Sequence, residues 1–254
     1  YRLEGEPDTP FAWEFPDRHD RLHYFQEVPS TMEPARELAR SGCPAMTVVV
    51  ADRQQRGRGR LDRRWLSEAG GLYFTVVLRP LLPPALGARA VFCASVSLAQ
   101  VLNRLYAVDA IVKWPNDILV AERKIAGILS EMEAEADRIS HLNIGIGINV
   151  NNDATQTNPN AVCLRQLLGR DVSRKELLAG FLDDFEQRLE NRPTAELLAE
   201  YKRCCVTLGR PVEVVTHRDT FRGHAVDIDE AGSLILETDD GRHRTIHHGD
   251  CFHL

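Results

Sequence analysis

The chain has 254 residues, a formal net charge of −6, and 43% hydrophobic and 27% charged residues, which is an ordinary composition for a soluble globular protein. No apolar run approaches the roughly 20 residues that span a bilayer, and no hydrophobic signal core lies at the N-terminus. The six cysteines form no C-x-x-C pair and four C-terminal histidines fit no ligand spacing, which predicts reduced thiols, no metal-ligand cluster and a cytoplasmic location.

The N-terminal part is predicted to be an irregular segment followed by a helix. Residues 1–20 are polar and contain three prolines, and we expect them to form a loose lead-in. Either Ser30 or Thr31 can cap a helix that has Pro34 in its first turn and ends near Arg40.

The middle of the chain combines apolar strands with long helices. Apolar runs predict six strands, at 47–51, 72–78, 110–114, 118–120, 124–131 and 142–150. The segment 88–106 is apolar on all sides and free of proline, which predicts a buried helix, and two more helices are expected at 173–191 and 194–203. Glycines alternate along 142–150, so we expect another group to approach that strand closely.

After Gly209 the pattern changes to short strands separated by Asp and Gly turns. These strands are expected at 212–215, 220–228, 234–237 and 244–247, and their close spacing suggests a small β-barrel. The predicted fold class is therefore α+β, a layered domain followed by a β module. We expect three parts, at 1–20, 21–205 and 206–254.

A dense cluster of arginines separates the first two predicted strands. Six arginines lie between residues 53 and 64 of a chain whose net charge is −6, and charge of that density usually meets an anion. Gly57 and Gly59 lie among them and let backbone N–H groups approach a ligand. No Gly-Lys-Ser/Thr follows, so this is not a Walker A loop. Because two core strands flank the segment, a phosphate-binding loop is a better interpretation than a disordered Arg-Gly tail that binds nucleic acid.

Several segments together resemble the biotin protein ligases. The matching motifs are Ser30-Thr31, Gln54 with Gly57-Arg58-Gly59-Arg60 and Trp65, Lys113-Trp114-Pro115-Asn116-Asp117, Lys124 to Glu131, Gly145 to Asn151, Leu208 to Val212 and Gly232 to Leu236. Each motif alone is weak, but their order and spacing over residues 22–254 are specific to that family. The resemblance implies a class II synthetase-like catalytic domain, with a mixed sheet and flanking helices, followed by a small SH3-like domain.

The resemblance also implies a two-step reaction. The carboxylate of biotin attacks the α-phosphate of ATP to give biotinyl-5′-adenylate and pyrophosphate, and a lysine of a biotin carboxyl carrier domain then attacks the adenylate. Mg²⁺ is expected to accompany ATP. The catalytic residues are expected to be Arg58, Lys124 and Asp117. For Asp117 three roles remain open: ordering Mg²⁺ through water, receiving the proton of the incoming lysine, or only shaping a turn.

The same resemblance implies a larger set of ligand contacts. They are Ser30, Thr31, Met32, Gln54, Gly57, Arg58, Gly59, Arg60, Trp65, Lys113, Asn116, Lys124, Gly127, Gly147 and Asn149. Neutral groups such as Gln54 suit the ureido ring, which needs both donors and acceptors, and guanidinium groups clamp carboxylate or phosphate oxygens. Trp65 either packs on adenine or is buried beside the arginine loop. We expect that loop to be disordered until a ligand binds.

The chain departs from the family pattern at two places. Met32 replaces the Asn of the common Ser-Thr-Asn motif, which puts one polar contact in doubt. Only about 20 polar residues precede the matching region. A winged-helix DNA-binding domain does not fit there, so we expect a monofunctional ligase without a repressor role.

Two other functions remain open at this stage. One is a lipoate or octanoate ligase of the same superfamily, and the other is a non-catalytic nucleic-acid-binding protein that uses the arginine loop. The negative net charge and an aromatic content of 7% disfavour the second, so neither nucleic acid nor a membrane is an expected partner. The expected partner is the carrier domain. An unpaired edge strand near 110–114 or 142–150 is predicted to bind it or to form a homodimer.

Overall fold

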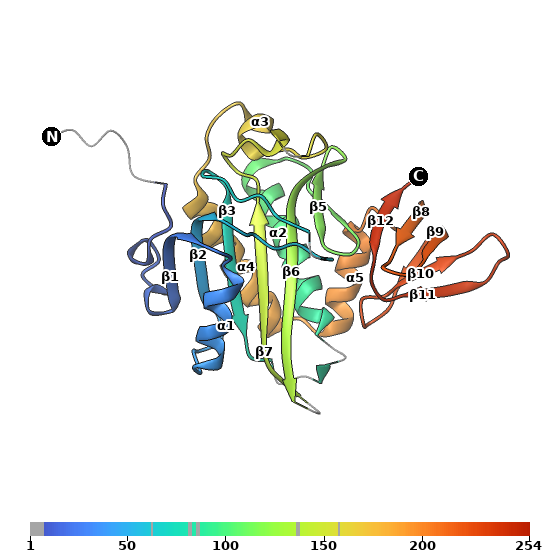
Figure 1. The fold of residues 1–254 in the computed structure, drawn as a ribbon, viewed down its shortest axis with the longest axis horizontal. Helices are drawn as coiled ribbons and strands as arrows, with labels where there is room; N and C mark the ends of the chain where they lie inside the picture. Colours follow the sequence, from blue (N-terminus) through green and yellow to red (C-terminus); the bar gives the residue numbers. More distant parts are fainter. Residues whose placement is uncertain (1–7, 62, 81–82, 85–86, 136–137, 157) are drawn as a thin grey trace.

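A computed structural model describes residues 8–61, 63–80, 83–84, 87–135, 138–156 and 158–254, and two sheets organise them (Figure 1). The strands of the larger sheet are β1 (Leu22–Val28), β2 (Thr47–Gln54), β3 (Leu72–Leu78), β4 (Ile111–Lys113), β5 (Asp117–Val120), β6 (Arg123–Glu135) and β7 (Arg138–Ile148). Those of the smaller sheet are β8 (Pro211–Val215), β9 (Thr220–Ile228), β10 (Leu234–Glu237), β11 (His243–Ile246) and β12 (Asp250–His253). The helices are α1 (Met32–Arg40), α2 (Ala88–Tyr106), α3 (Leu164–Leu168), α4 (Arg174–Asn191) and α5 (Thr194–Cys204), with short 3-10 turns η1 (Ala12–Glu14), η2 (His19–Arg21) and η4 (Ala154–Gln156).

The larger sheet is mixed, which confirms the predicted α+β class. Its strand order is β1-β2-β3-β7-β6-β5-β4. Strands β1 and β2 are parallel and are joined through α1, while every other neighbouring pair is antiparallel. The sequence analysis missed β1 because three consecutive residues of this edge strand, Phe25 to Glu27, are exposed and give no alternating apolar pattern.

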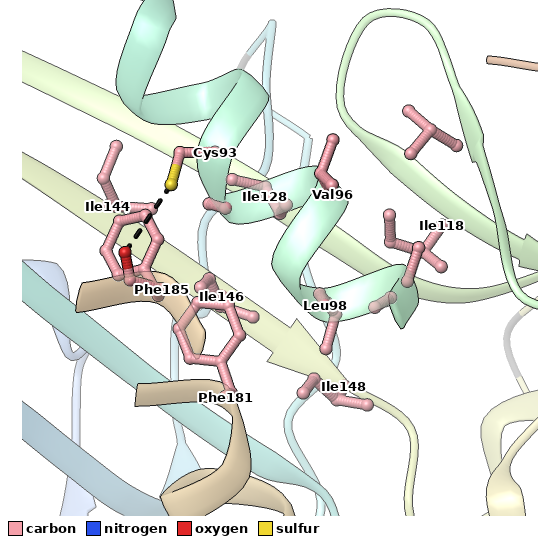
Figure 2. Close-up of a cluster of buried hydrophobic side chains, with 14 of the residues drawn as sticks. Cys93, Val96, Leu98, Ile118, Ile128, Ile144, Ile146, Ile148, Phe181 and Phe185 are labelled. Carbon is pink, nitrogen blue, oxygen red and sulfur yellow. Dashed lines mark hydrogen bonds between the residues drawn. The ribbon is translucent and has the colours of Figure 1, made fainter. Parts of the chain in front are cut away.

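Helices cover both faces of the larger sheet. Helix α1 lies on one face, and α2 and α4 lie on the other (Figure 1). The main core forms where α2 and α4 meet the isoleucines of β7; Figure 2 shows Ile144, Ile146 and Ile148 beside Phe181 and Phe185. This arrangement confirms that 88–106 is a buried helix, and it leaves the alternate residues of β7, including its glycines, on the opposite face.

The expectation of an unpaired edge strand is wrong for 142–150 and holds in part for 110–114. Strand β7 lies between β3 and β6, so both of its edges are paired. Strand β4 is the edge strand of the larger sheet, and on its outer side the Val112 carbonyl accepts a hydrogen bond from the Val206 amide at 2.8 Å. The chain after α5 therefore covers this edge at Val112.

The lead-in is partly ordered. Residues 1–7 of the expected loose segment lie outside the described residues. Asp8 forms a 2.7 Å ion pair with Arg174 of α4, Arg18 forms a 2.8 Å ion pair with Asp183 of the same helix, and Phe15 is buried. Polar residues of the segment are thus fixed by charged partners that are distant in sequence.

The C-terminal strands form a separate antiparallel sheet with the order β11-β10-β9-β8-β12. The expected boundary at 205–206 falls between α5 and β8. Trp114 joins the two sheets: its indole Nε1 donates to the Gly232 carbonyl at 2.9 Å and its amide donates to Thr207 Oγ1 at 3.0 Å. Strand β12 and the short helix α3 were not predicted from the sequence. All six cysteines are free thiols, and none of the described helices has both the length and the apolar character needed to cross a membrane.

Candidate active site

A cavity of about 570 Å³ lies over β6 and β7, between the arginine loop and the C-terminal sheet. Its lining contains every predicted site residue except Gly57. The structure therefore brings together side chains from α1, β2, the arginine loop, the Lys-Trp-Pro-Asn-Asp turn, β6 and β7. Gly57 is buried beside it, where a Cβ would be 2.3 Å from the Trp65 carbonyl oxygen.

The floor of the cavity is formed by β6 and β7 at positions where both strands carry glycine. Gly127 of β6 pairs with Gly147 of β7, and Trp65 lies directly on them. A Cβ at Gly147 would be 2.5 Å from Trp65 Nε1, and a Cβ at Gly145 would be 2.7 Å from the sulfur of Met32. The groups that approach the glycine strand are therefore Trp65 and Met32, and Trp65 forms a wall of the cavity.

Lys124 marks one end of this floor. Its Nζ is 2.6 Å from Asp117 Oδ1 and 5.2 Å from the centroid of the Trp65 ring. The backbone of Lys124 is fixed by hydrogen bonds to Asn160 and Val162 at 2.8 and 2.9 Å. A cation is thus held at the cavity with one carboxylate partner and one aromatic face.

Arg60, and not Arg58, turns its guanidinium into the cavity. Arg60 Nη1 donates to Asn116 Oδ1 at 3.4 Å, and burial lowers the pKa of Arg60 even though Asp250 and Asp117 favour its charged form. Arg58 lies at the rim with its side chain 45% exposed and forms a 2.6 Å ion pair with Glu131. Arg60 is therefore the desolvated cation, for which a ligand anion would be a strong partner.

Asn116 links the Lys-Trp-Pro-Asn-Asp turn to the floor. Its Nδ2 donates to the Ile128 carbonyl, and the Ile128 amide donates to the Asn116 carbonyl at 2.9 Å. These two bonds leave Oδ1 facing Arg60. Lys113, at the other end of the turn, lies with Nζ 6.0 Å from the centroid of Phe252.

Neutral hydrogen-bonding groups gather at the other end of the cavity. Gln54 Oε1 accepts from the Thr31 amide at 2.8 Å and from Thr31 Oγ1 at 3.2 Å, while its Nε2 donates to Ser67 Oγ at 2.7 Å. Thr75 Oγ1 donates to Thr31 Oγ1 at 2.8 Å. The Thr31 side chain therefore does not cap α1; Ser30 Oγ accepts from the Met32 amide at 3.4 Å.

Met32 closes the cavity beneath this network. It is 2% exposed, and Thr75 Oγ1 lies 3.4 Å from its sulfur. The thioether fills the space above Gly145 and adds an apolar surface. Asn149 follows β7 directly at the cavity wall, where its Oδ1 accepts from Asn152 Nδ2 at 3.1 Å.

The arginine loop is structured in its described residues. The Gly59 amide donates to the Arg63 carbonyl at 2.8 Å, and the Trp65 amide donates to the Gly57 carbonyl at 2.9 Å. These cross-loop bonds join the two sides of the loop, and the expectation that the loop becomes ordered when a ligand binds stays a prediction. Together with Arg58 and Glu131, they place the loop across the cavity.

The sequence analysis missed several residues that line or support the site. They are Ser67, Thr75, Glu131, Asn152, Asp250 and Phe252. Ser67 and Asn152 could have been found from their nearness to the matching motifs. The last two come from β12, and no local pattern indicates that this strand reaches the cavity.

Comparisons with known proteins agree with this geometry. The family model for the biotin/lipoate A/B protein ligase family matches residues 23–149, and the model for the biotin protein ligase C terminal domain matches residues 207–254. The bifunctional ligase/repressor BirA of Bacillus subtilis is 35% identical over 228 residues, which are 87% of this chain and 70% of that protein. The biotin–[acetyl-CoA-carboxylase] ligase of Paracoccus denitrificans is 31% identical over 223 residues, which are 84% of this chain and 92% of that protein.

A solved structure gives the same result. The biotin protein ligase from Aquifex aeolicus in complex with biotin and ATP has a TM-score of 0.76 and 30% sequence identity, and the match covers 92% of this chain and 98% of that one. Both the catalytic segment and the C-terminal segment have family matches, in the same order as in the fold described above. The chain therefore belongs to the biotin/lipoate A/B protein ligase family, among its biotin protein ligases.

Proposed function

We propose that this chain is an ATP-dependent ligase that adenylates biotin and transfers it to a lysine of a biotin carboxyl carrier protein. The observation that carries the proposal is one cavity that is lined by cations on one side and by a neutral hydrogen-bonding network on the other. The names of its relatives support it, since the Paracoccus protein acts on acetyl-CoA carboxylase and the Aquifex structure holds biotin and ATP. Residues 21–205 are proposed as the catalytic domain and 206–254 as the C-terminal domain.

The two ends of the cavity lie close enough for one small carboxylic acid to contact both. Met32 lies against Gly145, and Lys124 Nζ would be 3.4 Å from a Cβ at Gly127, the partner of Gly147, so the ends are separated by two residues of β7, or about 7 Å at roughly 3.3 Å per residue. Thr31 and Gln54 offer the donors and acceptors that a ureido ring needs. The apolar chain of biotin would lie against Trp65, which covers the glycine floor, with its carboxylate toward Lys124.

The cationic end fits the chemistry of adenylation. The biotin carboxylate attacks the α-phosphorus of ATP, a new C–O–P bond forms, and pyrophosphate leaves with the electron pair of the broken P–O bond. Lys124 and Arg60 lie where negative charge accumulates on the phosphoryl oxygens, and they are already oriented by Asp117 and Asn116. Oriented cations in a partly desolvated site stabilise such a transition state more than the ground state.

Asp117 is the group that would hold Mg²⁺. Magnesium is usually bound by one or two carboxylates together with substrate phosphates, and Asp117 supplies one carboxylate beside the cations. The ion would neutralise the charge of the phosphate groups. Asp117 itself pairs with Lys124 and keeps that ammonium aimed at the floor.

The second step requires that the mixed anhydride survive until the carrier lysine arrives. Trp65, on the glycine floor, and the arginine loop cover the cavity and limit the access of water. The lysine amine then attacks the acyl carbon, an amide bond forms, and AMP leaves. The acceptor is proposed to be a carboxylase carrier domain.

The test is biotin-dependent exchange of labelled pyrophosphate into ATP, with lipoate and octanoate as competing substrates. We expect exchange with biotin alone and its loss in Lys124→Ala. Lys202→Ala is the matched control, because Lys202 makes a 2.6 Å ion pair with Asp227 away from the cavity, and it should exchange normally. Exchange with lipoate instead of biotin would move the chain to the lipoate ligases, and no exchange with any acid would refute the ligase proposal.

A further inference from the structure

The C-terminal sheet is held firmly against the catalytic domain at β12. The Thr207 hydroxyl joins the Trp114 amide, at 3.0 Å, to His253 Nε2, at 3.1 Å. Arg210 bridges outward to Glu122, beside β6, at 3.0 Å. Strand β12 is therefore fixed at the side of the cavity, and three of its residues, Asp250, Cys251 and Phe252, line the cavity.

An ion pair crosses from this fixed strand to the arginine loop. The Asp250 carboxylate binds the Arg63 guanidinium, and the Asp250 side chain is 20% exposed while that of Arg63 is 62% exposed. Arg63 belongs to the described part of the loop that crosses the cavity. The contact therefore joins two segments that lie 187 positions apart in the sequence.

Fixing Arg63 also fixes the backbone that carries Arg60. The Arg63 amide donates to the Arg60 carbonyl at 3.1 Å, and the Arg63 carbonyl accepts from the Gly59 amide at 2.8 Å. Arg60 and Arg63 are thus joined by a direct backbone hydrogen bond. The ion pair between Asp250 and Arg63 therefore restrains Arg60 through one backbone hydrogen bond. The guanidinium of Arg60 faces Asn116.

We propose that Asp250 is a positioning residue, which holds the arginine loop closed through Arg63 and so places Arg60 over the reacting groups. The C-terminal domain then contributes to adenylation and to retention of the biotinyl-adenylate, in addition to any contact with the carrier. This inference rests on the proposed function for its chemistry, while the ion pair itself is a feature of the fold.

The distribution of charge favours this role over that of a surface ion pair. Asp250 also favours the charged form of Arg60, so one carboxylate offsets two neighbouring cations in the loop. Losing it would leave Arg60 and Arg63 to repel each other and open the loop. By contrast, Lys202 and Asp227 join the same two domains at 2.6 Å without touching the loop, which provides a control.

Two readouts on Asp250→Asn, Arg63→Gln and Asp227→Asn test the proposal. The first is hydrogen exchange at the Gly59 and Trp65 amides in the ligand-free protein. The second is release of biotinyl-adenylate into solution, measured as biotinylation of a bystander protein such as serum albumin. Asp250→Asn and Arg63→Gln should each accelerate both processes about fivefold, the factor that corresponds to roughly 1 kcal/mol for an ion pair. Asp227→Asn should change neither.

A charge swap separates positioning from a general loss of structure. Arg63→Asp combined with Asp250→Arg should recover most of the protection and retention that either single substitution loses. Equal values in wild type and Asp250→Asn, or a swap no better than the single variants, would overturn the proposal. If the wild type shows no biotin-dependent exchange, the proposed function fails, and the hydrogen-exchange readout still decides whether Asp250 holds the loop.

Discussion

Replacing Gly147 by alanine should displace Trp65 and weaken biotin binding without unfolding the protein. The added Cβ would lie 2.5 Å from Trp65 Nε1, 2.6 Å from Cε2 and 3.1 Å from Cδ1. Ordinary contacts between such atoms are about 3.5–4.0 Å, so the indole must move by roughly 1 Å. Overpacking of this kind typically costs about 1–3 kcal/mol.

This overpacking should weaken ligand binding more than it destabilises the fold, because Trp65 belongs to a loop and not to the main core. If displacement of the indole removes a wall of the cavity, about 1–3 kcal/mol corresponds to a roughly 5- to 150-fold rise in the biotin Kd. The free energy of unfolding should change little, since alanine is a better strand residue than glycine. Titration calorimetry gives the Kd, and urea unfolding gives the stability.

The Trp65→Ala background supplies the decisive comparison for Gly147. Without the indole, the methyl group loses its three nearest neighbours, so the second substitution should add almost nothing to the Kd. The two effects should therefore be strongly non-additive. If Gly147→Ala raises the Kd equally in both backgrounds, or leaves it unchanged in the wild type, then Trp65 is not the wall that the structure shows.

The other predictions concern charge, core packing and pH. Arg60→Ala should reduce pyrophosphate exchange about 100-fold or more, as expected for a cation aimed at the transition state. Arg58→Ala should reduce the exchange rate much less, because the Arg58 guanidinium pairs with Glu131 at the rim. Equal losses of exchange in the two variants would refute this ranking. Phe181→Ala should lower the free energy of unfolding by about 3–5 kcal/mol in urea denaturation, since Phe181 is fully buried and stacks on a neighbouring phenylalanine; a loss below about 1 kcal/mol would contradict it. Burial and neighbouring cations lower the pKa of His253 in the fold, so the unfolded chain takes up the proton first and stability should fall as pH drops below about 6.5. His253→Gln should flatten that fall in urea midpoints measured from pH 7.5 to 5.5, exposed His248→Gln should not, and identical slopes in all three proteins would exclude this role.

Local sequence patterns were sufficient to predict the elements that are apolar along their whole length. The segment 88–106 is apolar on all sides, and it forms α2 with the predicted bounds. The run 72–78 forms β3, buried along its whole length between β2 and β7. Such segments must be covered on both sides wherever they are placed, and their type follows from their length and their content of β-branched and aromatic residues. Strand β1 was missed because its edge position leaves half of it exposed.

The residues of the ligand site could also be predicted from the sequence, because the motifs contain residue types that are costly to bury in an apolar core. Lys124 at the start of an apolar strand and alternating glycines before Asn149 indicated a site without any coordinates. The family resemblance ordered these motifs and named the chemistry. The sequence did not indicate which arginine turns into the cavity. Arg58 and Arg60 have the same local pattern and differ only in their partners, which are Glu131 and Asn116.

Tertiary structure alone decided the contacts between distant segments. The pairing of Asp250 with Arg63, the link from Trp114 through Thr207 to β12, and the contact of residue 206 with β4 all join parts of the chain that share no sequence periodicity. A sequence records which groups need a partner, because burial of an unpaired charge or strand edge is costly. Which partner each group finds depends on how the two sheets pack, and that is a property of the whole fold.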